Sequence, residues 1–257
     1  MRTKSLISKY LRRAVMTMVT ILSAATLVSC SSSPPPPSAN AGLVENVSLP
    51  TSIADATLID QNGKVLSLSS FSGKIVMLVP FLTLCQEVCP LTAGILLQIQ
   101  SILEKDSLTS KVEIVELSLD PGRDVPSRLK AYSKLVGANW ELVTESKSNL
   151  ALIAKYFGFY YKIVPEPSPP GIDWLTGKPL TYDVEHSDAY VLIDGKQNMR
   201  FVTGASPDFT GTINPTLKKM LDKQGLNNLS HPQAPGWTLS SALSSISWLL
   251  GQSINAN

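Results

Sequence analysis

The sequence predicts an α/β fold in which helices flank a central mixed β-sheet. One observation behind this prediction is the almost continuous apolar run at residues 74–82, which has the length and composition of a strand at the centre of a sheet. Another is the alternation of strand-like and helix-like segments along the rest of the chain. The third is a hydrophobic content of 44% in 257 residues, which is enough to bury a core without disulfide bonds.

The first elements of this pattern are a hairpin, a strand and a helix. An N-terminal β-hairpin is expected over residues 57–68, because Asn62-Gly63 is a strong turn signal. The apolar run at 74–82 is the buried central strand. Residues 91–103 repeat apolar side chains at helical spacing, and Pro90 suits the first turn of that helix, where a missing N–H is tolerated.

The elements that follow are predicted strands and helices. Hydrophobic periodicity predicts strands at 112–119, 140–144 and 159–164, helices at 127–136 and 149–157, a hairpin formed by 189–194 and 199–203, and a last helix at 214–224. A Pro- and Gly-rich insertion at 165–180 interrupts this order.

The N-terminal segment is expected to direct export. Within residues 1–29, five basic side chains precede a mostly apolar run that is short for a membrane-spanning helix, as in a secretory signal. Its end, Leu27-Val28-Ser29-Cys30, resembles the lipobox of bacterial lipoproteins, which implies that Cys30 is lipidated; an uncleaved anchor is the alternative. Residues 30–50 are rich in Ser and Pro and are expected to form an extended linker. The folded domain would then be lipid-anchored at the extracytoplasmic face of the bacterial cell membrane.

The domain is expected to span residues 51–226 and to be followed by a tail at 227–257. From residue 30 onward, 17 Lys and Arg stand against 20 Asp and Glu, so nucleic acid is not an expected partner. The tail holds a possible amphipathic helix, with apolar side chains on one face and serines opposite. This helix either packs on the domain or contacts a membrane surface or a partner.

Two cysteines are left for the domain if Cys30 carries lipid. Cys85 and Cys89 lie between the end of the buried strand and the start of a helix, where backbone N–H groups and the helix dipole lower a thiol pKa. Their spacing allows the two sulfurs to bind one ion or each other. A passive disulfide is the alternative, although closing so short a loop stabilises a fold by only about 2 kcal/mol.

The chain has two histidines, in different surroundings. His186 follows the insertion and precedes the strand at 189–194, whereas His231 lies in a Ser-, Pro- and Asn-rich stretch and is expected to be solvated. Two thiolates and one imidazole make a ligand set that suits copper: soft sulfur ligands select copper(I), and the Irving–Williams order favours copper(II) among divalent ions. Structural zinc more often takes a fourth protein ligand. An ordinary hydrogen-bonded histidine is the alternative for His186.

Five short motifs occur in a characteristic order. They are Phe-Ser-Gly-Lys at 71–74, Cys-Gln-Glu-Val-Cys-Pro at 85–90, Ser-Leu-Asp-Pro-Gly-Arg-Asp at 118–124, Leu-Val-Gly-Ala-Asn-Trp at 135–140, and Val-Glu-His-Ser at 184–187. In combination they closely resemble the Sco/SenC family, the thioredoxin-like copper proteins of cytochrome c oxidase assembly. The resemblance covers residues 57–221.

The resemblance implies a thioredoxin-like fold and a copper ion bound by Cys85, Cys89 and His186. It also places Asp120 near the site, although a simple turn residue before proline is an equally good interpretation. Three residues depart from the usual family pattern. The family usually has Pro and Asp inside the cysteine motif and Asp before the histidine, where this chain has Gln86, Glu87 and Glu185.

Two functions from different classes follow from these residues. The first is a membrane-tethered copper chaperone that passes copper to the dinuclear centre in the copper-bearing subunit of cytochrome c oxidase. The second is an enzyme, a thiol-disulfide oxidoreductase that keeps the cysteines of an extracytoplasmic partner reduced. In that role Cys85 and Cys89 are the catalytic redox pair, form a disulfide when oxidised, and do not need His186 as a ligand. Peroxide reduction, a third use of a similar fold, fits this cysteine motif less well.

Overall fold

The computed structural model describes residues 33–254, so the expected signal segment at 1–29 and Cys30 lie outside it. It confirms the α/β class, since eight strands form one mixed sheet in the order β1-β10-β9-β4-β5-β6-β2-β3. The strands are β1 (Leu43–Ser48), β2 (Leu58–Asp60), β3 (Val65–Leu66), β4 (Ile75–Phe81), β5 (Val112–Ser118), β6 (Glu141–Thr144), β9 (Tyr190–Ile193) and β10 (Asn198–Thr203). A separate antiparallel pair consists of β7 (Tyr161–Val164) and β8 (Asp183–His186).

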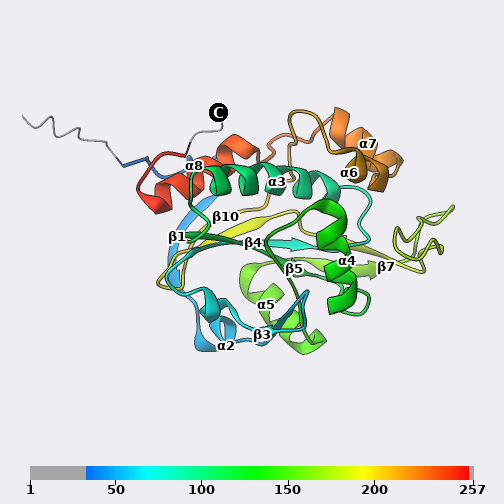
Figure 1. The fold of residues 1–257 in the computed structure, drawn as a ribbon, viewed down its shortest axis with the longest axis horizontal. Helices are drawn as coiled ribbons and strands as arrows, with labels where there is room; N and C mark the ends of the chain where they lie inside the picture. Colours follow the sequence, from blue (N-terminus) through cyan, green and yellow to red (C-terminus); the bar gives the residue numbers. More distant parts are fainter. Residues whose placement is uncertain (1–32, 255–257) are drawn as a thin grey trace, which may run out of the picture. The chain divides into compact units, whose positions relative to one another are not determined.

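Helices cover both faces of the sheet. They are α2 (Thr51–Ala54), the 3₁₀ helix η1 (Leu68–Phe71), α3 (Cys89–Lys105), α4 (Pro126–Val136), α5 (Lys147–Phe157), α6 (Pro215–Met220), α7 (Lys223–Ser230) and α8 (Leu239–Leu250). In Figure 1, α3, α6, α7 and α8 lie above the sheet, and α2 and α5 lie below it. Within residues 33–254, no helix combines the length and the hydropathy that a bilayer-spanning segment needs.

The centre of the sheet determines where a site can form. All seven residues of β4 are buried, and β4 runs parallel to β5, with Phe81 paired to Ser118 at their carboxyl ends. β6 continues this parallel arrangement beside β5, whereas β9 runs antiparallel to β4 on its other side. Because parallel strands end at the same edge, the loops that follow β4 and β5 emerge side by side.

Two predicted hairpins are confirmed. β2 and β3 pair antiparallel through Leu58 and Leu66 on either side of the Asn62-Gly63 turn, and Gly63 adopts a positive φ of 80°. β9 and β10 form the second antiparallel pair.

The sheet begins earlier than the domain boundary expected at residue 51. β1 lies within the Ser- and Pro-rich segment and pairs antiparallel with β10, for example Leu43 with Val202. It is an edge strand whose side chains are mostly exposed, so it carries no alternating apolar pattern. Backbone hydrogen bonds to β10 hold β1 in place. Because these bonds do not depend on residue type, the amino-acid composition of the segment does not indicate a strand.

The last predicted helix, at 214–224, is two helices. Leu221 adopts an extended conformation that ends α6, and the Asp222 carboxylate caps α7 by accepting the N–H of Gly225 at 2.7 Å. Beyond α7, the tail returns to the sheet. α8 contacts α3 and β4 and buries Ala242 and Ile246, as expected for a helix that packs on the domain.

Candidate metal centre

The two cysteines lie at the beginning of α3. Cys85 is in the loop that follows β4, and Cys89 is the first residue of the helix. The Cys85 sulfur accepts the backbone N–H groups of Val88, at 3.5 Å, and Cys89, at 3.4 Å. Both side chains are buried free thiols, so the structure describes the reduced pair.

The surroundings make the two thiols chemically unequal. The Cys89 thiol donates a hydrogen bond to the Cys85 sulfur and His186 adds positive charge, and together they outweigh burial and hold the pKa of Cys85 well below its usual range. Burial raises the pKa of Cys89, and the hydrogen bond to Cys85 raises it further. Cys85 therefore carries the larger thiolate fraction of the pair.

His186 is the last residue of β8, a strand that the sequence analysis did not predict. Its Nδ1 lies 2.9 Å from the Ser187 carbonyl oxygen and 3.6 Å from Oδ1 of Asp188, while Nε2 lies 3.7 Å from the Cys89 sulfur. Burial alone would lower the pKa of the ring, but Cys85 and Asp188 raise it to about 9. With Nδ1 donating to the carbonyl, Nε2 is the nitrogen that faces the thiols.

The three side chains have the spacing of a metal site. The sulfurs of Cys85 and Cys89 and a ring nitrogen of His186 all lie within 4.8 Å of one another. Two ligand atoms on one ion are separated by up to roughly 4.6 Å when metal–sulfur bonds measure about 2.3 Å. The ligand set therefore fits one soft ion after shifts of a few tenths of an ångström.

A cavity of about 580 Å³ opens over this group, lined by both Cys85 and His186. Carboxylates from three segments also line the cavity: Glu87, Asp183, Glu185 and Asp188. Burial, together with the charges of Cys85, Asp222 and Asp183, raises the pKa of Glu87 to about 7. The cavity thus gives a cation access to Cys85 and His186 from solvent.

Comparison with known proteins identifies the family. The SCO1/SenC family model matches residues 50–220. The chain belongs to the SCO1/SenC family. An SCO2-like protein of Rickettsia conorii is 28% identical over 158 residues, which are 60% of this chain and 70% of that protein. An SCO1 homologue of Bacillus subtilis is 30% identical over 91 residues, which are 34% of this chain and 46% of that protein.

The fold agrees with this assignment. The solved structure of Bradyrhizobium japonicum ScoI, described as having copper bound, superposes with a TM-score of 0.50 at 24% identity and covers 68% of this chain and 94% of that one. The thioredoxin-like fold expected from the sequence is therefore confirmed.

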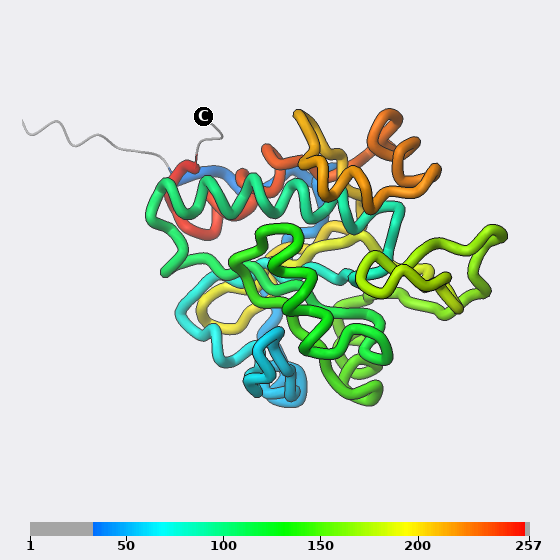
Figure 2. Tube along the Cα trace, turned by 45° about the vertical axis from the view of Figure 1, so that its right-hand side comes forward, coloured from blue at the N-terminus to red at the C-terminus, as the bar shows by residue number. Residues whose placement is uncertain are grey.

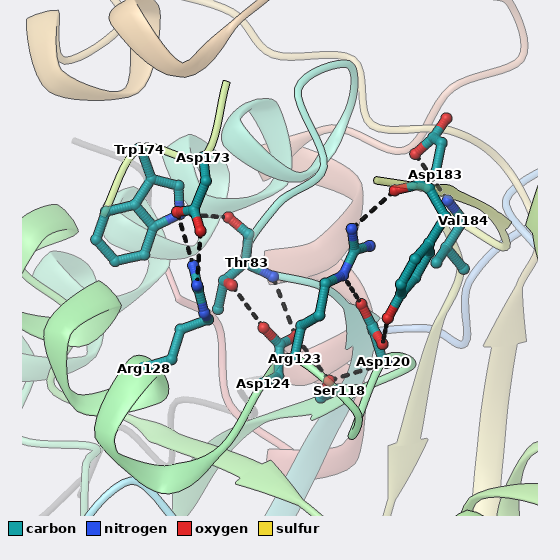
Figure 3. Close-up of polar contacts among 11 residues, drawn as sticks. Thr83, Ser118, Asp120, Arg123, Asp124, Arg128, Asp173, Trp174, Asp183 and Val184 are labelled. Carbon is teal, nitrogen blue, oxygen red and sulfur yellow. Dashed lines mark hydrogen bonds and ion pairs between the residues drawn. The ribbon is translucent and has the colours of Figure 1, made fainter. Parts of the chain in front are cut away.

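In this SCO1/SenC protein, the Asp124 carboxylate holds the loop that carries the thiols. Thr83, two residues before Cys85, donates its hydroxyl to Oδ1 of Asp124 at 2.5 Å and its N–H to Oδ2 at 3.2 Å. The Ser118 hydroxyl donates to the same carboxylate at 2.7 Å. These contacts join the ends of β4 and β5 (Figure 3).

The insertion at 165–180 also fastens this loop. The Trp174 indole donates to the Thr83 carbonyl at 2.8 Å, and the Gln86 side-chain amide donates to the Ile172 carbonyl at 2.9 Å. Arg128 of α4 holds Asp173 through two bonds of 2.9 and 2.7 Å. The insertion and the β7–β8 pair form an arm that extends away from the main sheet in Figure 2, where it is yellow-green.

Asp120 faces the arm. It pairs with Arg123 and accepts the Tyr182 hydroxyl at 2.9 Å. Among the hydrogen bonds of residues 33–254, none joins Asp120 to the two cysteines or to His186. The carboxylate that lies beside the imidazole is Asp188.

Sequence reasoning missed several residues around the site. Asp188 follows His186 by two positions, and this proximity was an available signal. Trp174 and Tyr182 lie in or beside an insertion without periodicity, so nothing in their pattern indicated that they contact the thiol loop or the segment after β5. Trp237 of the tail donates its indole N–H to the Asp188 carbonyl at 3.1 Å, a contact across 49 residues of sequence.

Proposed function

We propose that this protein is a copper chaperone that holds one copper ion with Cys85, Cys89 and His186. The observation that carries the proposal is the convergence of two sulfurs and one imidazole nitrogen within 4.8 Å beneath an open cavity. Thiolate ligands favour copper(I), and a site with three protein ligands leaves room for a ligand of the acceptor during transfer. Copper is therefore the cargo of the site.

Family membership supports cytochrome c oxidase as the destination. The SCO1/SenC resemblance implies a role in assembling this enzyme, and the proposed acceptor is the dinuclear copper centre of its copper-bearing subunit. Delivery at that centre also suits a donor on the extracytoplasmic side of the membrane.

The proposal includes a lipid tether. Residues 1–29 act as the export signal, Cys30 carries the lipid, and the chain before β1 links the anchor to the fold. What supports this is the order of basic, apolar and small residues before Cys30. Mass spectrometry of the mature protein tests it, because an unmodified Cys30 would contradict the lipid, and a retained signal segment would favour the uncleaved anchor instead.

The decisive experiment is an anaerobic copper(I) titration against a competing chelator. The wild-type protein is compared with Cys85→Ser, Cys89→Ser and His186→Ala, and His231→Ala serves as the matched control because His231 is exposed outside the site. One tight equivalent that is lost in the three site variants and kept in the control is the expected result. A fully reduced protein that binds no copper tightly would overturn the proposal.

A second candidate function is thiol-disulfide exchange with an extracytoplasmic partner. The opposite pKa shifts of Cys85 and Cys89 favour it, since one sulfur is prepared to attack while the other keeps its proton. Disulfide formation removes both sulfur ligands, so oxidation of the pair also controls copper binding. In His186→Ala, a pure reductase keeps its dithiol activity, whereas a chaperone loses tight copper binding.

A further inference from the structure

The proposed metal ligands come from two separate parts of the fold. Cys85 and Cys89 belong to the loop and helix that follow the central strand β4, whereas His186 ends β8. β8 pairs with β7 alone and is not a strand of the main sheet. Some contact outside the strand pairing must therefore fix the distance between the imidazole and the thiols.

The segment that follows β5 contacts both parts. On one side, Asp124 accepts the hydroxyl and N–H of Thr83, as described above, and so holds the loop with the thiols. Asp124 is only 1% exposed, so these bonds are shielded from water.

On the other side, the same segment holds Tyr182, the residue immediately before β8. The Tyr182 hydroxyl donates to Oδ1 of Asp120 at 2.9 Å, and the Arg123 guanidinium pairs with Oδ2 of the same carboxylate. Arg123 also donates to the Tyr182 backbone carbonyl at 2.7 Å and stacks on the Tyr182 ring, with 3.7 Å between the guanidinium carbon and the ring centroid. Figure 3 shows Asp120 and Arg123 beside the Asp124–Thr83 bonds.

We propose that Arg123 and Tyr182, acting with Asp120, are positioning residues that fix the histidine-bearing strand β8 relative to the thiol loop. The inference rests on the proposed function, because its consequence for the protein is the assembly of the copper site from two halves. We name the three residues the Tyr182 lock. None of them coordinates the ion; they act through the position of His186.

The lock is the anchor on the N-terminal side of His186. On the C-terminal side, Asp188 is held by the Trp237 indole and by the Ser206 hydroxyl, at 2.9 Å. Loss of the lock therefore leaves β8 held by its pairing with β7 and by the contacts of Asp188, so the β7–β8 pair and the imidazole gain freedom without unfolding of the main sheet. A swing of β8 about Asp188 would withdraw one of three ligands, which is a route to copper release.

The test uses Tyr182→Phe, which removes the hydroxyl that reaches Asp120 and keeps the ring that stacks on Arg123. The matched control is Tyr160→Phe, because the Tyr160 hydroxyl donates to Glu185 of β8 at 3.3 Å and makes no bond to the segment after β5. Both variants are made in the wild-type chain and in the His186→Ala chain.

Two measurements are made on each protein. Amide hydrogen exchange in the metal-free, reduced protein reports the freedom of residues 183–187, with residues 85–93 as the internal reference. Copper(I) affinity is measured by chelator competition. We expect Tyr182→Phe to exchange faster at 183–187 only, and to bind copper about tenfold more weakly, the order of one hydrogen bond to a charged group. The control should match the wild type in both measurements.

The double variant separates positioning from general destabilisation. If Tyr182 acts through His186, Tyr182→Phe has no further effect on copper affinity in the His186→Ala chain. A tenfold loss that persists there, or unchanged exchange at 183–187, would overturn the inference. Wild-type protein that binds no copper would overturn the proposed function instead, and the exchange result alone would then decide whether the lock holds β8.

Discussion

Gly225 of α7 packs so closely on Gln86 that a Cβ atom at position 225 would lie 2.3 Å from the Gln86 carbonyl oxygen. The N–H of Asp222, which caps α7, donates to the same oxygen at 2.9 Å. Helix α7 therefore rests directly on the segment between the two cysteines and closes this side of the thiol loop.

Substitution of Gly225 by Ala should disturb the site. In a helix interior this change normally stabilises a protein by up to about 1 kcal/mol. Here the added methyl group meets a backbone atom that cannot rotate away, so we expect a loss of about 1–3 kcal/mol and weaker copper binding. Thermal unfolding and chelator competition measure the two effects. Gly204→Ala is the control, because a Cβ there has no neighbour within 4 Å; equal behaviour of both variants would contradict the packing argument.

The two cysteines should react with alkylating reagents in a fixed order. Cys85 carries the lowered thiol pKa and lines the cavity, while Cys89 is more deeply buried and has a raised pKa. We expect iodoacetamide at neutral pH and limiting dose to modify Cys85 first, as measured by peptide mass spectrometry. Modification of Cys89 first, or of both at one rate, would show that the thiols are not distinguished in this way.

The buried carboxyl of Glu116 should make stability fall as pH rises. Burial raises its pKa to about 8, although the Trp140 indole donates to it at 2.8 Å and opposes the shift. Between the unfolded value near 4.3 and about 8, the folded state binds more protons than the unfolded state, so unfolding becomes easier with increasing pH. Glu116→Gln removes this pH-dependent destabilisation. Between pH 5 and pH 8, its free energy of unfolding should therefore rise relative to that of the wild type by roughly 1–3 kcal/mol.

Denaturant titrations at several pH values measure this gain. Glu113→Gln on the same strand is the control, and it should be slightly destabilising because it breaks the half-buried ion pair with Lys74. Part of the pH dependence should remain in Glu116→Gln, since burial also raises the pKa of Glu145 to about 9. A stability difference that does not change with pH would rule out a buried neutral Glu116.

The ion pair between Arg128 and Asp173 should hold the insertion on α4. Asp173→Asn keeps the shape of the side chain and removes the charge that both guanidinium bonds need, so we expect a loss of about 2 kcal/mol. Limited proteolysis should then cut within 165–180 sooner than in the wild type. Asp106→Asn is a suitable control because Asp106 is exposed at the end of α3. An unchanged cleavage rate in Asp173→Asn would show that other contacts hold the insertion.

Trp237 should link the tail to the site. Its side chain is buried, packs edge-on against Tyr190 with ring centroids 5.1 Å apart, and donates to the Asp188 carbonyl. Trp237→Ala should cost about 3–5 kcal/mol. Trp248→Ala, at a half-exposed position of α8, should cost clearly less in the same thermal melt. A larger loss of stability in Trp248→Ala than in Trp237→Ala would show that the tail stabilises the protein mainly through α8.

The sequence was most informative where burial is regular. The strand at β4 and the helix that follows it were predicted to within two residues at each end, because a central strand and a packed helix impose clear apolar patterns. The edge strand β1 and the strand β8 were not predicted. Both depend on backbone pairing, and the one apolar side chain of β8 is Val184, so their sequences carry almost no periodicity.

The candidate ligands were also predictable, but their supports were not. Cys85, Cys89 and His186 could be named because their chemistry is rare in the chain and their motifs resemble a family. The roles of Tyr182 and Trp174 depend on long-range contacts, which a single sequence without aligned relatives does not reveal. The split between α6 and α7 was missed for a similar reason, since Leu221 is apolar and fits a continuous helix by pattern alone.

If Cys30 carries the lipid that we propose, the pairing of β1 with β10 limits how far the folded domain can stand from the membrane. The chain that could link a lipid at Cys30 to the domain then ends before Leu43, instead of at the expected boundary at residue 51. At about 3.4 Å per residue, its full reach is roughly 45 Å, and a relaxed chain covers less. This radius is comparable to the thickness of a bilayer with its headgroups. Under the proposed function, an acceptor would have to present its copper site close to the membrane surface, and a protein with a longer linker before β1 would reach acceptors that the natural protein does not.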